Sequence, residues 1–284
     1  MSDTNIKTKT KIKTKIKTYI FNSIFGIILF VFSVSAIFPF AYMILVSFTQ
    51  KTMLNFDFNV REFNLSNYDL VFKNFNIIVN LRNSFIVTGC ACFFNALISS
   101  MAAYVFAKKQ FKGRDTLFAL YIATLMIPGQ VTLVPVFLIM KSLGLLNTYP
   151  ALIFPIVNAF GVFLVRQFML SIPNDLLEAA RIDGCSEHRI FFLLVLPLIT
   201  TVLVSLTIFT FISSWNDFLW PLVIASKPHM KTLTLAIAAL KGSYTTNYGL
   251  VMAGSTLAFL PPFILYLILQ KRFVEGIALS GIKA

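Results

Sequence analysis

Few residues in this chain of 284 have the types and spacing that catalysis or metal binding requires. Cys90 and Cys92 are two positions apart, so on a helix their side chains point to nearly opposite sides and cannot share a metal ion. His188 and His229 are far apart in the sequence, and Cys185 has no partner of the right spacing. The chain also lacks a Gly-x-x-x-x-Gly-Lys-Ser/Thr phosphate loop. We therefore expect no catalytic residue, no metal site, no cofactor and no ATP hydrolysis through such a loop.

A polar stretch between two apolar segments carries the most informative pattern. Glu178, Ala179 and Ala180 are followed by Gly184, and Pro197 comes at the start of the next apolar segment. Gly184 can take the left-handed conformation that ends a helix, and the small alanines allow a partner surface to approach closely. The pattern predicts a short helix that is either a docking surface or an ordinary amphipathic helix at a membrane surface.

The bounds of this helix are predicted from capping chemistry. Ser171 can cap a helix that Pro173 opens, since proline suits the first helical turn. Asp175 lies early in the helix, where the positive end of the helix dipole favours a carboxylate. Ser186 can cap the following helix, which continues into the next apolar segment. The whole loop spans about residues 171–192.

The composition places the chain in a membrane. Hydrophobic residues make up 57% of it and charged residues 12%, which is too little polar surface to cover a water-soluble globule. A helix needs about 20 apolar residues to cross a bilayer. Segments of this kind lie at residues 19–48, 84–107, 117–138, 151–170, 193–215 and 250–269. None alternates like a barrel strand, so we predict an all-α polytopic membrane protein with six transmembrane helices.

Lysines and arginines are distributed unevenly between the two sides of this arrangement. With the N-terminus inside, 16 of the 24 basic residues fall on the inner side and 8 on the outer side. Because basic residues are enriched in cytoplasmic loops, both termini and Glu178 are predicted to be cytoplasmic. We therefore expect a multi-pass protein of the cell membrane, with Glu178 on the side where nucleotide is found.

Residues 1–18 form a lysine-rich tail ahead of the six-helix domain at residues 19–284. A basic run beside a span is typical of an orientation anchor that also meets anionic lipid head groups. This reading is favoured over nucleic-acid binding as the explanation of the net charge of +13. A cleavable signal peptide is disfavoured, because the apolar run continues to about Phe48, well past the length of a signal core.

Charged residues are almost absent from the six apolar segments. A proton or sodium relay needs ionisable groups at membrane depth, and Asp217, near the outer end of the fifth segment, is the only carboxylate within an apolar segment. Its neighbours Trp215, Asn216 and Trp220 are more typical of an anchor at the lipid head groups. If this protein pumps, another polypeptide supplies the energy, and an ion-coupled secondary transporter is the weaker alternative.

Two amides and several prolines lie inside the spans. Asn95 and Asn158 are candidate contacts for a polar solute, although hydrogen bonding between helices is the more common use of such residues. A proline removes a backbone donor and can kink a helix, which makes it a candidate hinge in a moving pore. These prolines are Pro128, Pro135, Pro155, Pro197, Pro261 and Pro262.

The segment around Glu178 resembles the Glu-Ala-Ala loop of permease subunits in binding-protein-dependent ABC importers. The matching residues are Glu178, Ala179, Ala180, Gly184, Leu194, Leu196 and Pro197, with Leu194 in place of the consensus isoleucine. Blocks at residues 166–173, 215–222 and 270–276 are similar to the second, maltose-type permease of the carbohydrate branch, and the resemblance covers roughly residues 82–284. Cys185 stands where the family commonly has alanine.

This resemblance implies the fold of a type I ABC importer permease. It also implies a second, homologous permease, two cytoplasmic ATPase subunits and an external sugar-binding protein, so this chain itself would not be an enzyme. The implied coupling residues are Glu178, Ala179, Ala180 and Gly184, with Arg181 and Asp183 at the rim and Pro197 at the end of the motif. Residues 276–284 are similar to a tail near the ATPases, and residues 226–247 to a segment that reaches toward the binding protein.

The implied substrate is a sugar or an oligosaccharide, with glycerol phosphate or a polyol as the alternative. A phosphorylated substrate favours arginines fixed in the pore. Arg82 and Arg166 lie at the edges of spans instead. The binding protein is expected to select the individual sugar.

Overall fold

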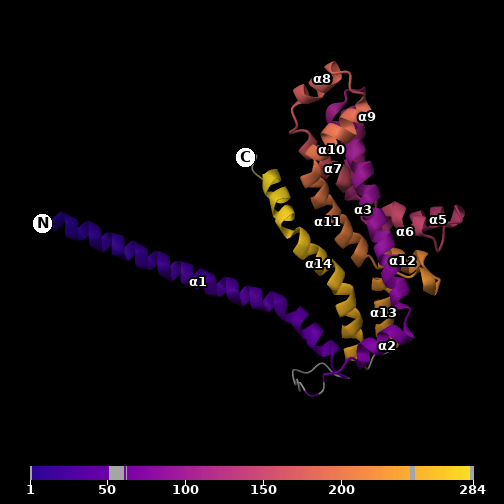
Figure 1. The fold of residues 1–284 in the computed structure, drawn as a ribbon, viewed down its shortest axis with the longest axis horizontal. Coiled ribbons are helices and arrows are strands. Elements are labelled where there is room, and N and C mark those ends of the chain that lie inside the picture. Colours follow the sequence, from indigo (N-terminus) through magenta and orange to yellow (C-terminus); the bar gives the residue numbers. More distant parts are fainter. Residues whose placement is uncertain (1, 51–60, 62, 244–246, 282–284) are drawn as a thin grey trace.

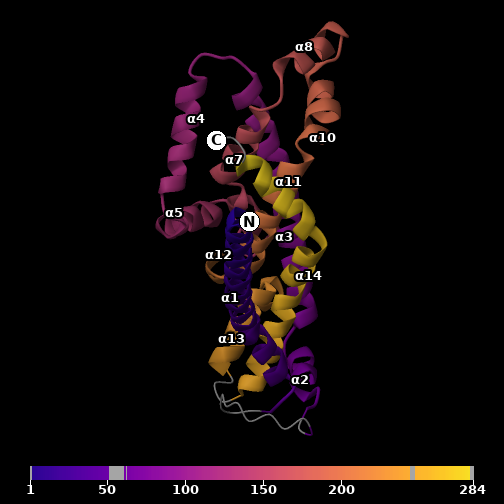
Figure 2. The same ribbon diagram turned by 90° about the vertical axis from the view of Figure 1, so that its left-hand side faces the viewer.

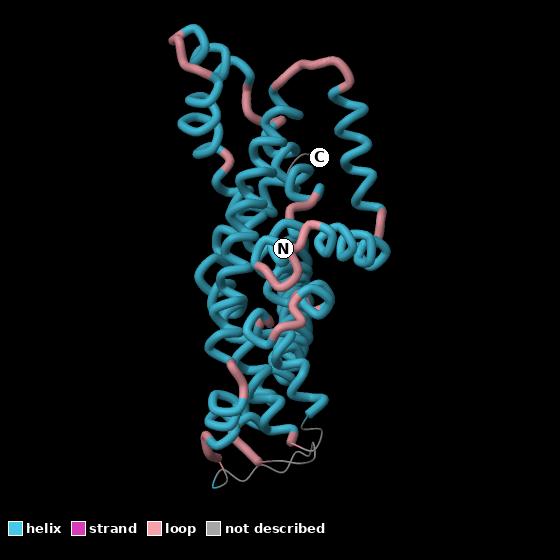
Figure 3. The backbone as a smooth tube through the Cα atoms, turned by 90° about the vertical axis from the view of Figure 1, so that its right-hand side faces the viewer, coloured by secondary structure: helices cyan, strands magenta, loops and turns pink. Residues whose placement is uncertain are grey.

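The computed structural model describes residues 2–50, 61, 63–243 and 247–281. These residues form helices and loops, with no β-strand among them (Figure 3). The prediction of an all-α fold is therefore confirmed for the part of the chain that the structure covers.

Most of the helices form an elongated bundle (Figure 1). In chain order they are α1 (Ser2–Ser47), α2 (Ser66–Asn74), α3 (Ile77–Lys108), α4 (Arg114–Ala123), η2 (Thr124–Met126), α5 (Gly129–Ser142), α6 (Tyr149–Ile153), η3 (Phe154–Ile156), α7 (Ala159–Met169), α8 (Asn174–Ile182), α9 (Glu187–Arg189), η4 (Ile190–Val195), α10 (Leu196–Leu198), α11 (Thr200–Asn216), α12 (Leu219–Ile224), η5 (Pro228–Met230), α13 (Leu233–Ser243) and α14 (Tyr248–Gly281). The π-helix is η4, and the other η elements are 3₁₀-helices.

Three of these helices, α1, α3 and α14, are each long and apolar enough to cross a membrane alone. Three further candidates are bent pairs: α4–η2 with α5 at 103°, α6–η3 with α7 at 45°, and α9–α10 with α11 at 76°. Six spans result within the described residues if each bent pair counts as one. The structure thus supports six segments, but half of them are broken rather than continuous helices.

The breaks lie at or near prolines that the sequence marks as hinges. Ile127 is extended, with ψ of 115°, because a residue before proline is pushed out of the helical region. Pro128 itself has ψ of 133° and is also outside the helical region. The second break falls after Pro155, at Val157 and Asn158, and the third follows Pro197. Pro135, Pro261 and Pro262 are different, since α5 and α14 continue through them without interruption.

The long helix α3 is the central element of the bundle, packing against α7, α11 and α13. It contributes to each of three buried apolar clusters, through Tyr104 at the end near α8, Val87 along its length and Ile77 at the end near α2. Figure 2 shows α8 at one end of the molecule and α2 at the other. We call these the α8 end and the α2 end.

The first helix leaves the bundle rather than packing within it (Figure 1). Its apolar stretch, Phe21–Ser47, has no buried residue in its most hydrophobic window. The helix begins at Ser2, so the backbone of the lysine-rich segment continues the helix of the first span without a break.

Residues 226–247, which resemble a segment that reaches toward a binding protein, are mostly helical where the structure describes them. Most of this segment is η5 and α13, and Leu233, Leu235 and Leu240 are buried. Because α13 packs on α3 and α14, Leu233 and Leu240 join the core at the α2 end, while Leu235 joins the cluster that contains Val87. Residues 244–246 lie outside the described part of the chain.

Gly249 lies close to the backbone of Thr49 and the side chain of Asn67. A Cβ there would collide with the Thr49 carbonyl oxygen and lie 2.6 Å from Asn67 Nδ2, whereas a Cβ at Gly89 of α3 meets nothing within 4 Å. We expect Gly249→Ala to destabilise the fold by about 1–3 kcal/mol, as overpacking does. Gly89→Ala should leave stability equal or higher, since alanine favours a helix. Thermal unfolding in detergent measures both, and equal midpoints for Gly249→Ala and the unaltered protein would contradict the prediction.

Candidate coupling site

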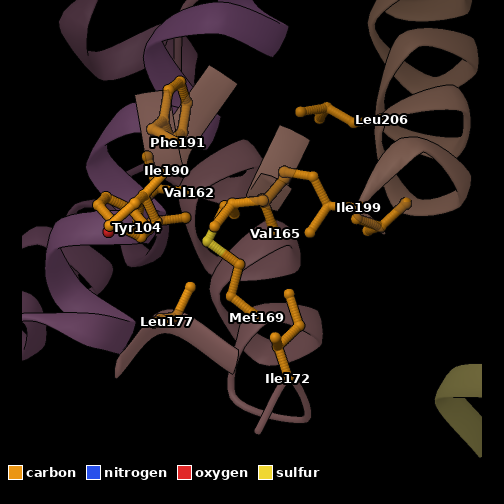
Figure 4. Packing of buried hydrophobic residues seen from close by; sticks show 13 residues of the cluster. Tyr104, Val162, Val165, Met169, Ile172, Leu177, Ile190, Phe191, Ile199 and Leu206 are labelled. Atoms are coloured by element: carbon orange, nitrogen blue, oxygen red, sulfur yellow. The ribbon is translucent and has the colours of Figure 1, made fainter. Parts of the chain in front are cut away.

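The helix α8 buries one side chain and exposes most of the others. Leu177 is 2% exposed and packs in the apolar cluster formed with Tyr104, Met169 and Phe191 (Figure 4). Glu178 and Ala179 are exposed, and Ala180 is half-buried. Leu177 therefore joins the helix to the core, while most of the remaining helix surface stays exposed.

The start of α8 differs from the prediction. The helix begins at Asn174, and Pro173 occupies the capping position without a side-chain cap. The Ser171 hydroxyl donates to the carbonyl of Phe168 at 2.7 Å, so it completes the preceding helix instead of capping α8. Ser171 is thus wrong as the cap, because its side chain finds an acceptor one turn back.

The end of α8 agrees with the prediction. Gly184 has a φ of +77°, the left-handed conformation that ends a helix and that side chains with a Cβ rarely adopt. The amide of Cys185 donates to the carbonyl of Ala180 at 3.0 Å, which closes the turn. Ser186 caps α9 by accepting from the amide of Arg189 at 3.5 Å.

The predicted coupling residues do not all lie together. Those from 178 to 184 form α8 and its terminal turn, with Glu178, Arg181 and Asp183 exposed. Pro197 lies in α10, beyond the π-helix η4. It precedes the bend that leads into α11.

One charged residue of this region, Glu187, was not among the residues predicted from the sequence. Glu187, at the start of α9, accepts a hydrogen bond from Arg181 Nε at 2.9 Å and lies within 2.5 Å of Lys109 Nζ. The carboxylate holds the pKa of Arg181 above its usual value through this hydrogen bond. Sequence spacing gives little sign of the cluster, because Lys109 belongs to a distant part of the chain.

Asn95 and Asn158 each make hydrogen bonds within the protein. Asn95 is buried, donates from Nδ2 to Thr210 Oγ1 at 2.8 Å and accepts from Ser99 Oγ at 3.1 Å, which ties α3 to α11. Asn158 caps α7 by accepting from the amide of Gly161 at 3.3 Å. Neither residue lines either of the two cavities beside the broken spans.

Two cavities lie beside the broken spans. The first, of about 440 Å³, lies between α5, α11 and α12, and its polar lining includes Gln130, Thr132, Ser213 and Asp217. The second, of about 580 Å³, lies between α1, α11, α13 and α14 and is mostly aromatic and aliphatic. Among the described residues, no lysine or arginine lines either cavity.

Side chains that could bind a metal ion are scattered in the described part of the chain. No three His, Cys, Asp or Glu side chains come together within it. Cys92 is buried, with its Sγ 3.6 Å from the carbonyl of Thr207, while Cys185 is exposed in the turn after α8.

Known proteins resemble this chain in sequence and in fold. The family model described as "binding-protein-dependent transport system inner membrane component" matches residues 95–278. An arabino-oligosaccharide transport system permease of Halalkalibacterium halodurans is 37% identical over 87% of this chain and 91% of the relative. An sn-glycerol-3-phosphate transport system permease of Pectobacterium atrosepticum is 36% identical over 69% of this chain and 71% of the relative.

The fold is also shared with a solved structure. A bacterial ABC transporter involved in the import of the acidic polysaccharide alginate contains a chain that matches with a TM-score of 0.77 and 24% sequence identity. The match covers 89% of this chain and 96% of the other. The family match, the 37% identity and the shared fold lead to one conclusion: this chain belongs to the family of inner membrane permeases of binding-protein-dependent ABC importers.

Proposed function

We propose that this chain is one of two membrane subunits in an ATP-driven importer of a sugar or an oligosaccharide, and that α8 is the element on which separate ATPase subunits act. The observation that carries the proposal is the form of α8. It is anchored by Leu177, ends at the left-handed Gly184 and presents Glu178 at one end of the molecule.

The exposed surface of α8 fits a protein cleft better than a lipid surface. Ile182 is 86% exposed and follows Glu178 by four residues, which places an apolar and an acidic side chain on the same face. A helix lying in a membrane surface separates apolar from charged faces. The face of α8 that carries Glu178 and Ile182, beside the small Ala179, suits a partner protein that supplies both an apolar contact and a hydrogen-bond donor.

The α8 end is assigned to the cytoplasm in this proposal. Lys108, Lys109, Arg114, Arg181 and Arg189 lie at or near this end, and basic residues are enriched on the cytoplasmic side of membrane proteins. Both termini are placed on the same side, as the even number of spans requires. ATP is then available to the subunits that contact α8.

A second permease is supported by surfaces that this chain leaves uncovered. The apolar stretch of α1 projects from the bundle, and neither α4 nor α5 has a buried residue. The 103° break at Pro128 turns α5 across the bundle (Figure 2). Because non-helical backbone at membrane depth must face protein or water, this break fits the contact between two permeases beside a water-filled path.

A sugar is the substrate that the cavities favour. Gln130, Thr132 and Ser213 can hydrogen-bond hydroxyl groups, and a neutral solute needs no fixed cation. Glycerol phosphate is the second candidate because of the 36% identical relative. Against it, Arg166 lies with its guanidinium 4.0 Å from the ring centroid of Phe118 and donates to the carbonyl of Phe106 at 3.4 Å, while Arg82 is exposed near the α2 end.

The orientation is tested by labelling with a membrane-impermeant thiol reagent on intact cells. With the native cysteines replaced, Glu178→Cys should stay unlabelled until the membrane is opened. Lys73→Cys, on the exposed surface of α2 at the opposite end, should be labelled at once. Labelling of position 178 from outside would show that α8 faces the wrong side for ATPase contact.

The function is tested by uptake into liposomes. The chain with its partner permease, ATPase subunits and binding protein should import a labelled neutral oligosaccharide, such as an arabino-oligosaccharide, when ATP is present. The chain alone should show neither ATP hydrolysis nor uptake driven by a proton or sodium gradient. Ion-driven uptake by the isolated chain would overturn the proposal, and ATP-driven uptake of glycerol phosphate in place of neutral sugars would establish the second candidate.

The role of α8 is tested at its terminal turn. Gly184→Val should distort the turn, because a β-branched residue resists a φ of +77°. Gly184→Asn is the matched control, since asparagine tolerates this conformation. The valine variant, and Glu178→Lys, should lose ATPase attachment or sugar-stimulated ATP hydrolysis, while Gly184→Asn retains most of both. Normal transport by Gly184→Val with the ATPases attached would rule out α8 as the coupling element.

A further inference from the structure

The first turn of α8 is tied to the end of α3. Lys108, the last residue of α3, donates from Nζ to the carbonyl of Ile172 at 2.5 Å and to Oδ1 of Asn174 at 3.0 Å. Ile172 precedes α8 and Asn174 is its first residue. One lysine thus bridges the two helices at the point where α8 begins.

The last turn of α8 is tied to the same place through Glu187. Its carboxylate accepts from Arg181 Nε at 2.9 Å on one oxygen. On the other oxygen it accepts from the Tyr104 hydroxyl at 2.8 Å and pairs with Lys109 Nζ at 2.5 Å. Arg181 belongs to α8, whereas Tyr104 and Lys109 belong to the end of α3 and the residue after it.

These contacts are arranged to position α8 more than to stabilise the fold. The side chains of Lys109, Arg181 and Glu187 are 31%, 37% and 43% exposed, and ion pairs at such surfaces contribute little to folding. The Tyr104 ring, in contrast, is buried and contacts the Phe191 ring at 5.5 Å between centroids. A fixed tyrosine and two cations converging on one carboxylate restrain where α8 lies relative to α3.

The other end of α3 holds the opposite side of the molecule. Asn83 donates from Nδ2 to the carbonyls of His229 at 2.8 Å and Lys231 at 3.0 Å, and Ser84 accepts from the amide of Leu233 at 2.8 Å. The same helix therefore bonds α8 at one end and the η5–α13 segment at the other. Within the described residues, α3 runs uninterrupted between these two attachments.

We propose that Lys108 and the cluster of Tyr104, Lys109, Arg181 and Glu187 form a two-point clamp that makes α3 the rod carrying the displacement of α8 to the η5–α13 segment. Glu187 is its central positioning residue. The inference rests on the proposed function, in which ATPase subunits move α8. Without the clamp, the links at Pro173 and Gly184 absorb that movement, because both are turns rather than helix.

The test uses the complete importer in liposomes and measures sugar imported for each ATP hydrolysed, with the neutral oligosaccharide that the unaltered importer takes up as the probe. Glu187→Gln should keep the complex assembled and ATP hydrolysis near its normal rate, while sugar imported for each ATP falls several-fold. Glu187→Lys and Lys109→Glu should each show a larger loss, because Glu187→Lys sets a cation against Lys109 and Arg181, and Lys109→Glu sets two carboxylates against each other. Asp69→Asn, which removes the exposed ion pair with Lys73 on α2, is the matched control and should change nothing.

A further variant keeps the test open if Glu187→Gln does not assemble. Tyr104→Phe removes one hydroxyl and leaves the ring in the core, and a smaller fall in sugar imported for each ATP is expected. A normal ratio in assembled Glu187→Gln or Tyr104→Phe overturns the clamp. If the unaltered importer shows no ATP-driven uptake, the proposed function fails instead, so the two failures are distinguishable.

Discussion

The structure depends on one constraint: backbone amides and carbonyls in hydrocarbon must be paired inside the protein. Continuous helices meet it in α1, α3 and α14, and three other candidate spans meet it in halves that bend by 45° to 103°. Each bend leaves a few backbone groups that need protein or water beside them. The bend at Pro128 lies next to a cavity with Gln130 and Thr132 in its lining, so the place where the helix stops is also where the chain offers polar groups.

The continuous helix α3 gives the broken spans a common support. Asn95 bonds Thr210 of α11, and Gly161 of α7 lies so close to Ser99 that a Cβ would collide with it. Such close approach and hydrogen bonding between helices are what hold membrane bundles together in the absence of a hydrophobic driving force. Because α3 is hydrogen-bonded to α8 at one end and to the η5–α13 segment at the other, a displacement of one of these elements can be passed to the other through α3.

Sequence patterns were sufficient for features that depend on local chemistry. The six apolar segments follow from length, and the left-handed turn at Gly184 follows from the lack of a side chain. Features that depend on distant neighbours were missed. The partners of Glu187 include Tyr104, 83 residues away. The helix α13 is too short to span a membrane, and its leucines are buried only because it packs against α3 and α14. The sequence alone also did not show which prolines interrupt a helix, since the backbone of α14 stays helical through Pro261 and Pro262.

The central claim, that ATPase subunits act on α8, is tested most directly by photo-crosslinking in the assembled importer. A photoreactive amino acid is placed at Ala179 on α8 and, as the control, at Lys73 on α2; both positions are exposed. The account predicts covalent capture of an ATPase subunit from position 179 and none from position 73. Capture of the ATPase from position 73, or capture of lipid alone from position 179, would contradict it.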